Sequence, residues 1–107
     1  MSNKVKELIN GEKLQINQDK IVVLDFYSPT CGPCKMLSFI LNDIAKEFAS
    51  EVEFIKINFN ENKMLCEEYN VTGYPTLIFF SNGAEYKRMQ GLQAKSLIQD
   101  TIKEKLS

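Results

Sequence analysis

The sequence predicts an α/β fold in which helices cover both faces of a central mixed β-sheet. An unbroken apolar run, IVVLDFY at residues 21–27, is typical of a central parallel strand that is buried on both sides. Helix-like stretches with one apolar face alternate with further strand-like runs. Near the end of the chain, Asn82-Gly83 separates two such runs, which indicates a hairpin. Helices between strands, together with a hairpin, predict a mixed sheet.

The first part of the chain is expected to begin with a short helix. Apolar side chains recur at helical spacing over residues 3–10, and Gly11 suits the C-cap of this helix. A weaker pattern at residues 14–16 predicts a brief edge strand. The central strand at residues 21–27 follows, and Asp25 is its only charged residue.

The middle of the chain predicts a strand-helix-strand unit. Apolar residues fall on one face of a helix over residues 34–49, opposite a polar face. A second strand is predicted at residues 52–57, and a short helix at residues 61–69. Two strands joined by such a helix are expected to run parallel with a right-handed crossover.

The last part predicts a hairpin and a closing helix. Strands are expected at residues 76–80 and 85–89, with Gly83 as a turn residue between them. A helix over residues 93–106 closes the chain. Its predicted inner face consists of Ala94, Leu97, Ile98, Ile102 and Leu106. With no linker and no internal repeat, residues 1–107 are expected to form a single domain.

Composition and charge exclude several classes of function. The 107 residues are 44% apolar and 25% charged, as in an ordinary water-soluble protein. The net charge is −1 and the 13 Lys and Arg residues are spread along the chain, so no nucleic-acid partner is expected. The sequence contains no run of 18 apolar residues, and MSNKVKELIN at its start does not resemble a signal peptide. We therefore expect a cytoplasmic monomer with no membrane partner.

Three cysteines and no histidine narrow the possible chemistry. An odd number of cysteines is too few for a disulfide scaffold, and in a reducing cytosol a close pair is more often catalytic or metal-binding. The close pair is Cys31 and Cys34, separated by Gly32 and Pro33. A structural zinc site needs four ligands, and only Cys66 is left to join the pair. Metal binding is therefore not expected, and we interpret Cys66 as a small buried apolar residue rather than a regulatory thiol.

The cysteine pair lies where a buried strand ends and a long helix begins, which is where open α/β folds place their sites. Unpaired N–H groups and the macrodipole at a helix N-terminus favour negative charge, so Cys31 is expected to ionise more easily than an ordinary cysteine. A thiolate attacks disulfides, and Cys34 is placed to resolve the resulting mixed disulfide. Gly32 permits close backbone approach, and Pro33 fits the first helical turn. The spacing thus allows a reversible dithiol–disulfide couple.

Asp25 needs an explanation, because a carboxylate inside an apolar strand is costly and has a raised pKa unless it is paired. Lys56, in the neighbouring predicted strand, is a candidate partner. One interpretation makes Asp25 the proton acceptor for Cys34, through water. The other places Asp25 at a strand end facing solvent, with no role in the reaction. The strand pattern alone favours neither.

The motif CGPCK at residues 31–35, preceded by VVLDFY and followed by GYPT at residues 73–76, resembles the thioredoxin family. The similarity continues through FIKINFNEN and GYPTLIFFSNG to the closing GLQAKSLIQDTIKEKL, and so covers nearly the whole chain. It implies the thioredoxin fold and a protein disulfide reductase whose redox group is a Cys31–Cys34 disulfide, with no bound cofactor. The partners it implies are a thioredoxin reductase as electron donor and protein disulfides as substrates.

The resemblance also assigns roles to particular residues. Cys31 becomes the attacking thiol, Cys34 the resolving thiol, Asp25 the buried proton acceptor and Lys56 the neighbour that modulates it. The Tyr74–Pro75 peptide bond is implied to be cis and to lie opposite the cysteines, where an extended substrate segment is expected to pair with exposed backbone. The implied substrate-binding residues are Thr30, Gly32, Pro33, Tyr74, Pro75 and Gly91.

Several positions depart from the family pattern. Tyr27 and Thr30 stand where the family usually has tryptophan, and Asn60 replaces a common aspartate. Phe39 stands where the family often has a helix-kinking proline. The aromatic cover over the site is therefore expected to be reduced, which affects substrate preference and reduction potential rather than thiol exchange itself.

Two rival functions remain open from the sequence. The first is a thioredoxin-like protein that serves one dedicated partner or acts as an oxidant or isomerase, although Gly-Pro between the cysteines resembles the reducing members. The second is a binding module that grips a partner near Pro75 without thiol exchange. The presence of both Cys31 and Cys34 argues against the second.

Overall fold

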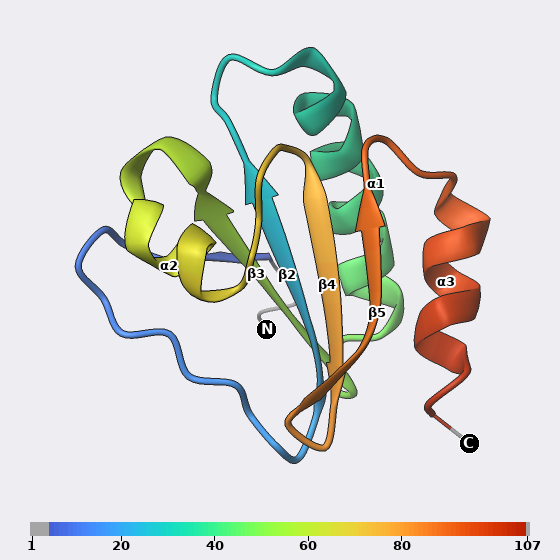
Figure 1. The fold of residues 1–107 in the computed structure, drawn as a ribbon. Helices are drawn as coiled ribbons and strands as arrows, with labels where there is room; N and C mark the ends of the chain where they lie inside the picture. Colours follow the sequence, from blue (N-terminus) through green and yellow to red (C-terminus); the bar gives the residue numbers. More distant parts are fainter. Residues whose placement is uncertain (1–4, 107) are drawn as a thin grey trace.

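The computed structural model describes residues 5–106, and at its centre is a five-stranded sheet in the order β1-β3-β2-β4-β5 (Figure 1). In chain order the elements are β1 (Lys6–Glu7), β2 (Ile21–Tyr27), α1 (Gly32–Glu47), β3 (Val52–Asn58), the 3-10 turn η1 (Phe59–Glu61), α2 (Lys63–Glu68), β4 (Thr76–Ser81), β5 (Ala84–Gln90) and α3 (Lys95–Lys103). Strands β1 and β2 each run parallel to β3, whereas β4 is antiparallel to both β2 and β5. The sheet is therefore mixed, as the sequence predicts.

Strand β2 lies at the centre of the sheet, and its residues from Ile21 to Phe26 are all buried. Its side chains alternate between two apolar cores. Val23 packs among side chains of α1 and α3, whereas Leu24 packs with Cys66 of α2 on the opposite face. Figure 1 shows the same arrangement, with α1 and α3 on one side of the sheet and α2 on the other. This burial fixes the point where the chain leaves β2 and turns into α1.

The chain enters the sheet as a strand, so the helix predicted over residues 3–10 is wrong where the structure describes it. Its first two residues lie outside the described part of the chain. Strand β1 pairs with β3, with Glu7 opposite Lys56, and the Leu8 N–H donates to the Lys56 carbonyl oxygen at 2.9 Å. The edge of β3 carries backbone N–H and C=O groups, and these would lack their β1 partners if residues 6–8 formed a helix. The strand predicted at residues 14–16 is also wrong, because that segment has no regular structure. Its apolar side chains pack on the core that contains Leu24 and Cys66, which is called the α2-side core below.

Helix α3 is shorter than predicted and buries a narrower face. It starts after, and ends before, the predicted bounds of 93–106. Ile98 and Ile102 are fully buried, but Leu97 is 44% exposed and Ala94 is also exposed, which corrects the predicted inner face. A helix that contacts its neighbours along one side buries positions four apart, and the flanking positions stay at the edge.

The turn between β4 and β5 has the backbone that its sequence predicts. Asn82 and Gly83 both have positive φ, 55° and 80° respectively. This left-handed conformation closes a two-residue hairpin, and glycine adopts it without a steric penalty from Cβ. A Cβ at position 83 would also lie 3.0 Å from Cγ of Gln18.

Gly83→Ala is expected to lower the free energy of unfolding by about 1 kcal/mol, because alanine is strained at positive φ. Urea denaturation of the oxidised protein measures this change. Gly73→Ala is the matched control, since a Cβ there meets no atom within 4 Å and the backbone is not in the left-handed region. Equal losses in the two variants would contradict the attribution of the cost to the turn.

Candidate active site

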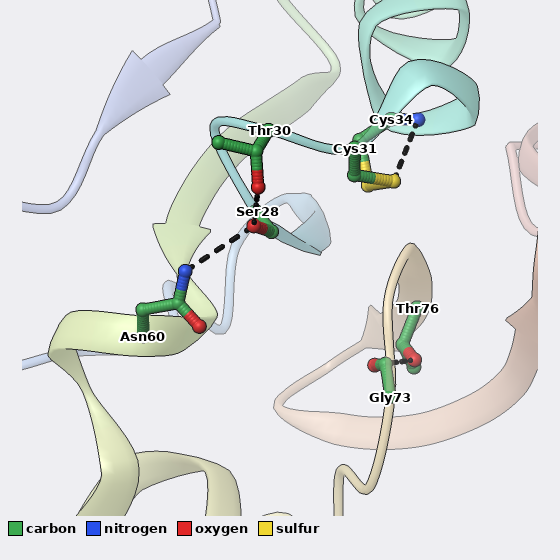
Figure 2. The surroundings of a disulfide bond; sticks show 7 residues. All are labelled: Ser28, Thr30, Cys31, Cys34, Asn60, Gly73 and Thr76. Carbon is green, nitrogen blue, oxygen red and sulfur yellow. Dashed lines mark hydrogen bonds between the residues drawn. A yellow bond between two sulfur atoms is a disulfide. The ribbon is translucent and has the colours of Figure 1, made fainter.

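Cys31 and Cys34 form a disulfide at the start of α1, with their Cα atoms 5.2 Å apart. Figure 2 shows the pair where the chain turns into the helix. Cys31 is the N-cap residue: its backbone is extended, with φ −98° and ψ 117°, and its sulfur accepts a hydrogen bond from the Cys34 N–H at 3.2 Å. One of the N–H groups that a helix leaves unpaired at its N-terminus thus points to the Cys31 sulfur.

The two cysteines differ in exposure. Cys31 is partly exposed, whereas Cys34 is only 3% exposed. Gly32 and Pro33 between them are both exposed, and Pro33 lies in the first turn of α1, where its missing N–H leaves no helical hydrogen bond unmade. The Cys31 side of the disulfide is therefore the side that a second protein reaches first.

Hydrogen bonds from the loop after β3 hold the turn that precedes Cys31 (Figure 2). The Asn60 amide donates to the hydroxyl of Ser28 at 3.2 Å, and that hydroxyl lies 3.4 Å from the hydroxyl of Thr30. The Cys31 N–H donates to the Ser28 carbonyl oxygen at 3.2 Å. Thr30 is exposed at the site, and Ser28 is buried beneath it.

The loop before β4 lies at the same end of the sheet as the disulfide, because β4 begins at Thr76 beside the end of β2. The Tyr74–Pro75 peptide bond in this loop is cis, as the family resemblance implies. The Thr76 hydroxyl donates to the Gly73 carbonyl oxygen at 2.8 Å, and Figure 2 shows this segment coming up toward the disulfide. Gly91, with φ 84°, donates its N–H to the Pro75 carbonyl oxygen at 2.8 Å. Tyr74 is 44% exposed at this end of the sheet.

Asp25 lies within β2 and is 1% exposed, so the solvent-facing alternative is wrong. Both of its carboxyl oxygens lack a hydrogen-bond partner among the described residues. Burial raises the Asp25 pKa to about 7, while the positive charge of Lys56 opposes this rise and the negative charge of Glu7 adds to it. The carboxyl group therefore changes charge near neutral pH, where a general base is most effective.

Lys56 lies beside Asp25 in register across β2 and β3, but its ammonium group is held elsewhere. Its Nζ donates to Oγ of Ser38 on α1 at 3.4 Å and lies 4.4 Å from the centre of the Tyr27 ring. The Tyr27 hydroxyl in turn donates to a carboxylate oxygen of Glu7. Within the described residues, Lys56 thus acts on Asp25 as a nearby charge rather than as a hydrogen-bond partner.

A pocket of about 300 Å³ adjoins Tyr27 and Lys56, and Asp25 is not among its lining residues. Its lining consists of Tyr27, Ser28, Pro29, Cys34, Lys35, Ser38, Phe39 and Lys56. Cys34 from α1 and Lys56 from β3 therefore open to the same space. This space is wide enough for water, which suits proton transfer at the buried cysteine.

Sequence reasoning missed three residues of this arrangement: Glu7, Ser28 and Ser38. Glu7 was hidden because its segment was predicted as a helix. Ser38 follows Cys34 by one helical turn, and this spacing was a usable signal, because side chains four apart share a helix face. Ser28 carried no comparable signal, since its partner comes from the distant loop after β3.

Among residues 5–106, no group of three or more His, Cys, Asp or Glu side chains is arranged to hold a metal ion. Cys66 is 4% exposed and packs in the α2-side core, with its sulfur 3.8 Å from the Phe59 carbonyl oxygen. Burial raises the pKa of the Cys66 thiol, which is the behaviour of an inert cysteine. No helix within residues 5–106 is long and apolar enough to cross a membrane.

Comparison with known proteins decides the family. A model of the thioredoxin family matches residues 7–104. The chain belongs to the thioredoxin family. The thioredoxin of Rickettsia felis is 36% identical over 102 residues, which cover 95% of this chain and 96% of that protein. The thioredoxin of Porphyra purpurea is 36% identical over 92 residues, 86% of each chain. A mutant thioredoxin from Halobacterium salinarum has a TM-score of 0.84 at 28% identity, and the match covers 98% of this chain and 93% of that one.

Family and geometry together define the activity. Thioredoxins are thiol–disulfide oxidoreductases, and the Cys31–Cys34 disulfide is the redox group that this activity uses. The chain is a thioredoxin-type disulfide reductase, and its mixed sheet with helices on both faces is the thioredoxin fold. This activity decides against the binding-module alternative.

Asp25→Asn is expected to stabilise the oxidised protein at pH 8 and to change its stability little at pH 4. The carboxyl group ionises near its ordinary pKa of 3.8 in the unfolded chain, but burial keeps it protonated to about pH 7 in the folded protein. Between these values the unfolded state binds fewer protons, so the wild type loses stability as the pH rises, and the neutral amide does not. At 1.36 kcal/mol per pKa unit, the gain at pH 8 is on the order of 4 kcal/mol.

Denaturant-induced unfolding of the oxidised protein from pH 4 to pH 8 measures this gain. Asp43→Asn is the matched control, because the Asp43 side chain on α1 is 61% exposed. The control is expected to show no comparable gain. A stability difference for Asp25→Asn that is the same at pH 4 and pH 8 would show that Asp25 does not ionise in a buried site.

Proposed function

We propose that the chain reduces disulfide bonds of other proteins and is itself reduced by a thioredoxin reductase. The observation that supports this most directly is the disulfide at the N-terminus of α1, with Cys31 partly exposed and Cys34 buried. In the proposed cycle Cys31 is the nucleophile and Cys34 is the resolving thiol.

In the first step, the Cys31 thiolate attacks one sulfur of a substrate disulfide. A bond forms between Cys31 and that sulfur, the substrate S–S bond breaks, and the other substrate sulfur leaves as a thiolate. The start of α1 favours the thiolate through its macrodipole and its N–H groups, and the Cys34 N–H already donates to the Cys31 sulfur.

In the second step, Cys34 attacks the Cys31 sulfur of the mixed disulfide. The bond between Cys31 and the substrate breaks, the second substrate thiolate leaves, and the Cys31–Cys34 disulfide closes. Cys34 must first lose its proton, and we assign Asp25 as the acceptor, through water that enters by the pocket lined by Cys34 and Lys56. Lys56 modulates this acceptor, because its positive charge favours the ionised carboxylate. Two electrons thus pass to the substrate, and the reductase restores them.

The proposed substrate-binding surface combines the turn around Cys31 with the facing loop before β4. Its members are Thr30, Gly32, Pro33, Tyr74, Pro75 and Gly91. An extended substrate segment would pair with the backbone at Tyr74 as an added strand, while its disulfide meets the exposed Cys31. Recognition through backbone predicts broad specificity among protein substrates.

The remaining parts of the proposal concern context. We propose a single domain over residues 1–107 that works as a monomer in the cytoplasm, where a thioredoxin reductase keeps the cysteine pair reduced. The reaction needs no bound cofactor, since the disulfide itself carries the two electrons. A net charge of −1 with dispersed Lys and Arg supports a function without nucleic acid or membrane partners.

Insulin reduction by the chain, with a thioredoxin reductase and its electron source, tests the cycle. Cys31→Ser is expected to lower the turnover rate about a thousandfold or more, because the nucleophile is lost. Cys66→Ala is the matched control and should keep the wild-type rate, since the third cysteine is buried in the α2-side core. Turnover by Cys31→Ser at the wild-type rate would refute the assigned nucleophile.

Cys34→Ser is expected to stop after the first step and to accumulate as a mixed disulfide between Cys31 and the substrate. Non-reducing electrophoresis detects this adduct, and dithiothreitol should release it. The double variant Cys31→Ser/Cys34→Ser serves as the control without an adduct. If Cys34→Ser forms no adduct with a substrate that the wild type reduces, the order of the two thiols is wrong.

A further inference from the structure

Glu7, Lys56 and Asp25 lie in one row across three adjacent strands. Glu7 on β1 and Asp25 on β2 are both register partners of Lys56 on β3. Register partners in parallel strands direct their side chains to the same face of the sheet. This is the face that α1 covers, because Lys56 donates to Ser38 on that helix. The row therefore places one cation between two carboxylates next to the helix that carries the disulfide.

Tyr27 contacts two members of this row, Lys56 and Glu7. Its ring lies 4.4 Å from Nζ of Lys56, and its hydroxyl donates to the Glu7 carboxylate. A cation is attracted to the face of an aromatic ring, so the position of the ring helps to decide where the ammonium group lies. The Glu7 carboxylate anchors the Tyr27 ring by accepting from the Tyr27 hydroxyl. The ammonium group consequently rests against Tyr27 and Ser38, and both Asp25 oxygens stay without a hydrogen bond.

We propose that Glu7 is a positioning residue for the second step of thiol exchange. It anchors Tyr27 against Lys56 and, by its own negative charge, keeps Asp25 protonated in a larger fraction of the molecules. This inference rests on the proposed role of Asp25 as the proton acceptor for Cys34. Both effects favour protonated Asp25, because each offsets the stabilisation of the Asp25 carboxylate by the positive charge of Lys56. Below neutral pH, fewer molecules then carry the base that takes the Cys34 proton.

Few titratable groups face Asp25 from the elements packed around it. They are Lys56 on β3, Glu7 on β1 and Tyr27 on β2 itself, and Lys56 and Tyr27 share one pocket with Cys34 and Lys35 of α1. On the other side, β4 places the uncharged Leu77 opposite Asp25. Burial and Glu7 also raise the pKa of Tyr27, so its hydroxyl stays protonated and keeps donating across the working pH range. Glu7 is therefore the carboxylate through which the charge near Asp25 is best altered without touching the cysteines.

The test follows the reaction of the reduced protein with an aromatic disulfide that releases a coloured thiolate in each step. Stopped-flow absorbance separates the attack by Cys31 from the attack by Cys34. Glu7→Gln keeps an oxygen that accepts from Tyr27 but removes the charge. It is expected to move the pH midpoint of the second step to lower pH and to speed that step about two- to threefold at pH 6, because more Asp25 is ionised. The first step should keep its rate.

Two further variants complete the comparison. Tyr27→Phe keeps the Glu7 charge but removes the anchoring hydroxyl, so Lys56 is freed to approach Asp25 and the midpoint should also fall. Glu53→Gln is the matched control: it removes one negative charge from β3 at a position that faces the α2 side, with Ile55, and should leave the midpoint unchanged.

The outcomes distinguish this inference from the proposed function. If the Glu7→Gln and Glu53→Gln profiles both coincide with the wild type, Glu7 has no such role and the inference is overturned. Asp25→Asn tests the acceptor itself and is expected to slow the second step while leaving the first step intact. A wild-type second step in Asp25→Asn would overturn the role of Asp25 and the inference with it, whereas insulin reduction would still report on the cysteine pair.

Discussion

The burial of β2 is the constraint on which the rest of the site depends. Its residues from Ile21 to Phe26 lie between two apolar cores, so any shift of the strand would expose apolar surface at a cost of roughly 25 cal/mol per Å². The chain must therefore leave the sheet after Tyr27, and the turn into α1 puts Cys31 at the N-cap. The same burial surrounds Asp25. One strand thus fixes both the position of the disulfide and the environment of the carboxyl group.

The charges around Asp25 are arranged differently from those of a buried ion pair. A lysine that donated directly to Asp25 would hold the pKa of the carboxyl group low, and breaking such a pair would leave a buried charge. Here Lys56 is held by Ser38 and Tyr27 instead, and its charge offsets only part of the cost of burial. The pKa of about 7 follows from this incomplete compensation. A carboxyl group that destabilises the folded protein when ionised thereby changes charge near neutral pH, as the proposed proton transfer requires.

Local patterns predicted the elements that carry the chemistry. The apolar run of β2, the amphipathic α1 and the Asn82-Gly83 turn each depend on neighbouring residues, and all three are confirmed. The predictions from the sequence are wrong where strand pairing depends on residues far apart in the chain. The short β1 exists because β3 offers an open edge, and helical spacing of a few apolar residues could not reveal that edge. The same error hid Glu7, whose contact with Tyr27 links β1 to β2 across β3. The cysteine pair, in contrast, could be recognised from its own spacing and from the helix that follows it.

The sequence predicts a reduced aromatic cover over the site, and in the turn before Cys31 the structure has hydrogen bonds between small polar side chains. Where the family usually packs a tryptophan ring, this chain has Thr30, and the turn is held through the buried Ser28 hydroxyl, to which Asn60 donates. Each such hydrogen bond contributes about 1 kcal/mol net, and the contribution is larger where the loss of one partner leaves a buried group unsatisfied. The position of Cys31 consequently depends on the loop after β3 as well as on α1. Because Thr30 is small and exposed, the Cys31 side of the disulfide is left without a large side chain at this position.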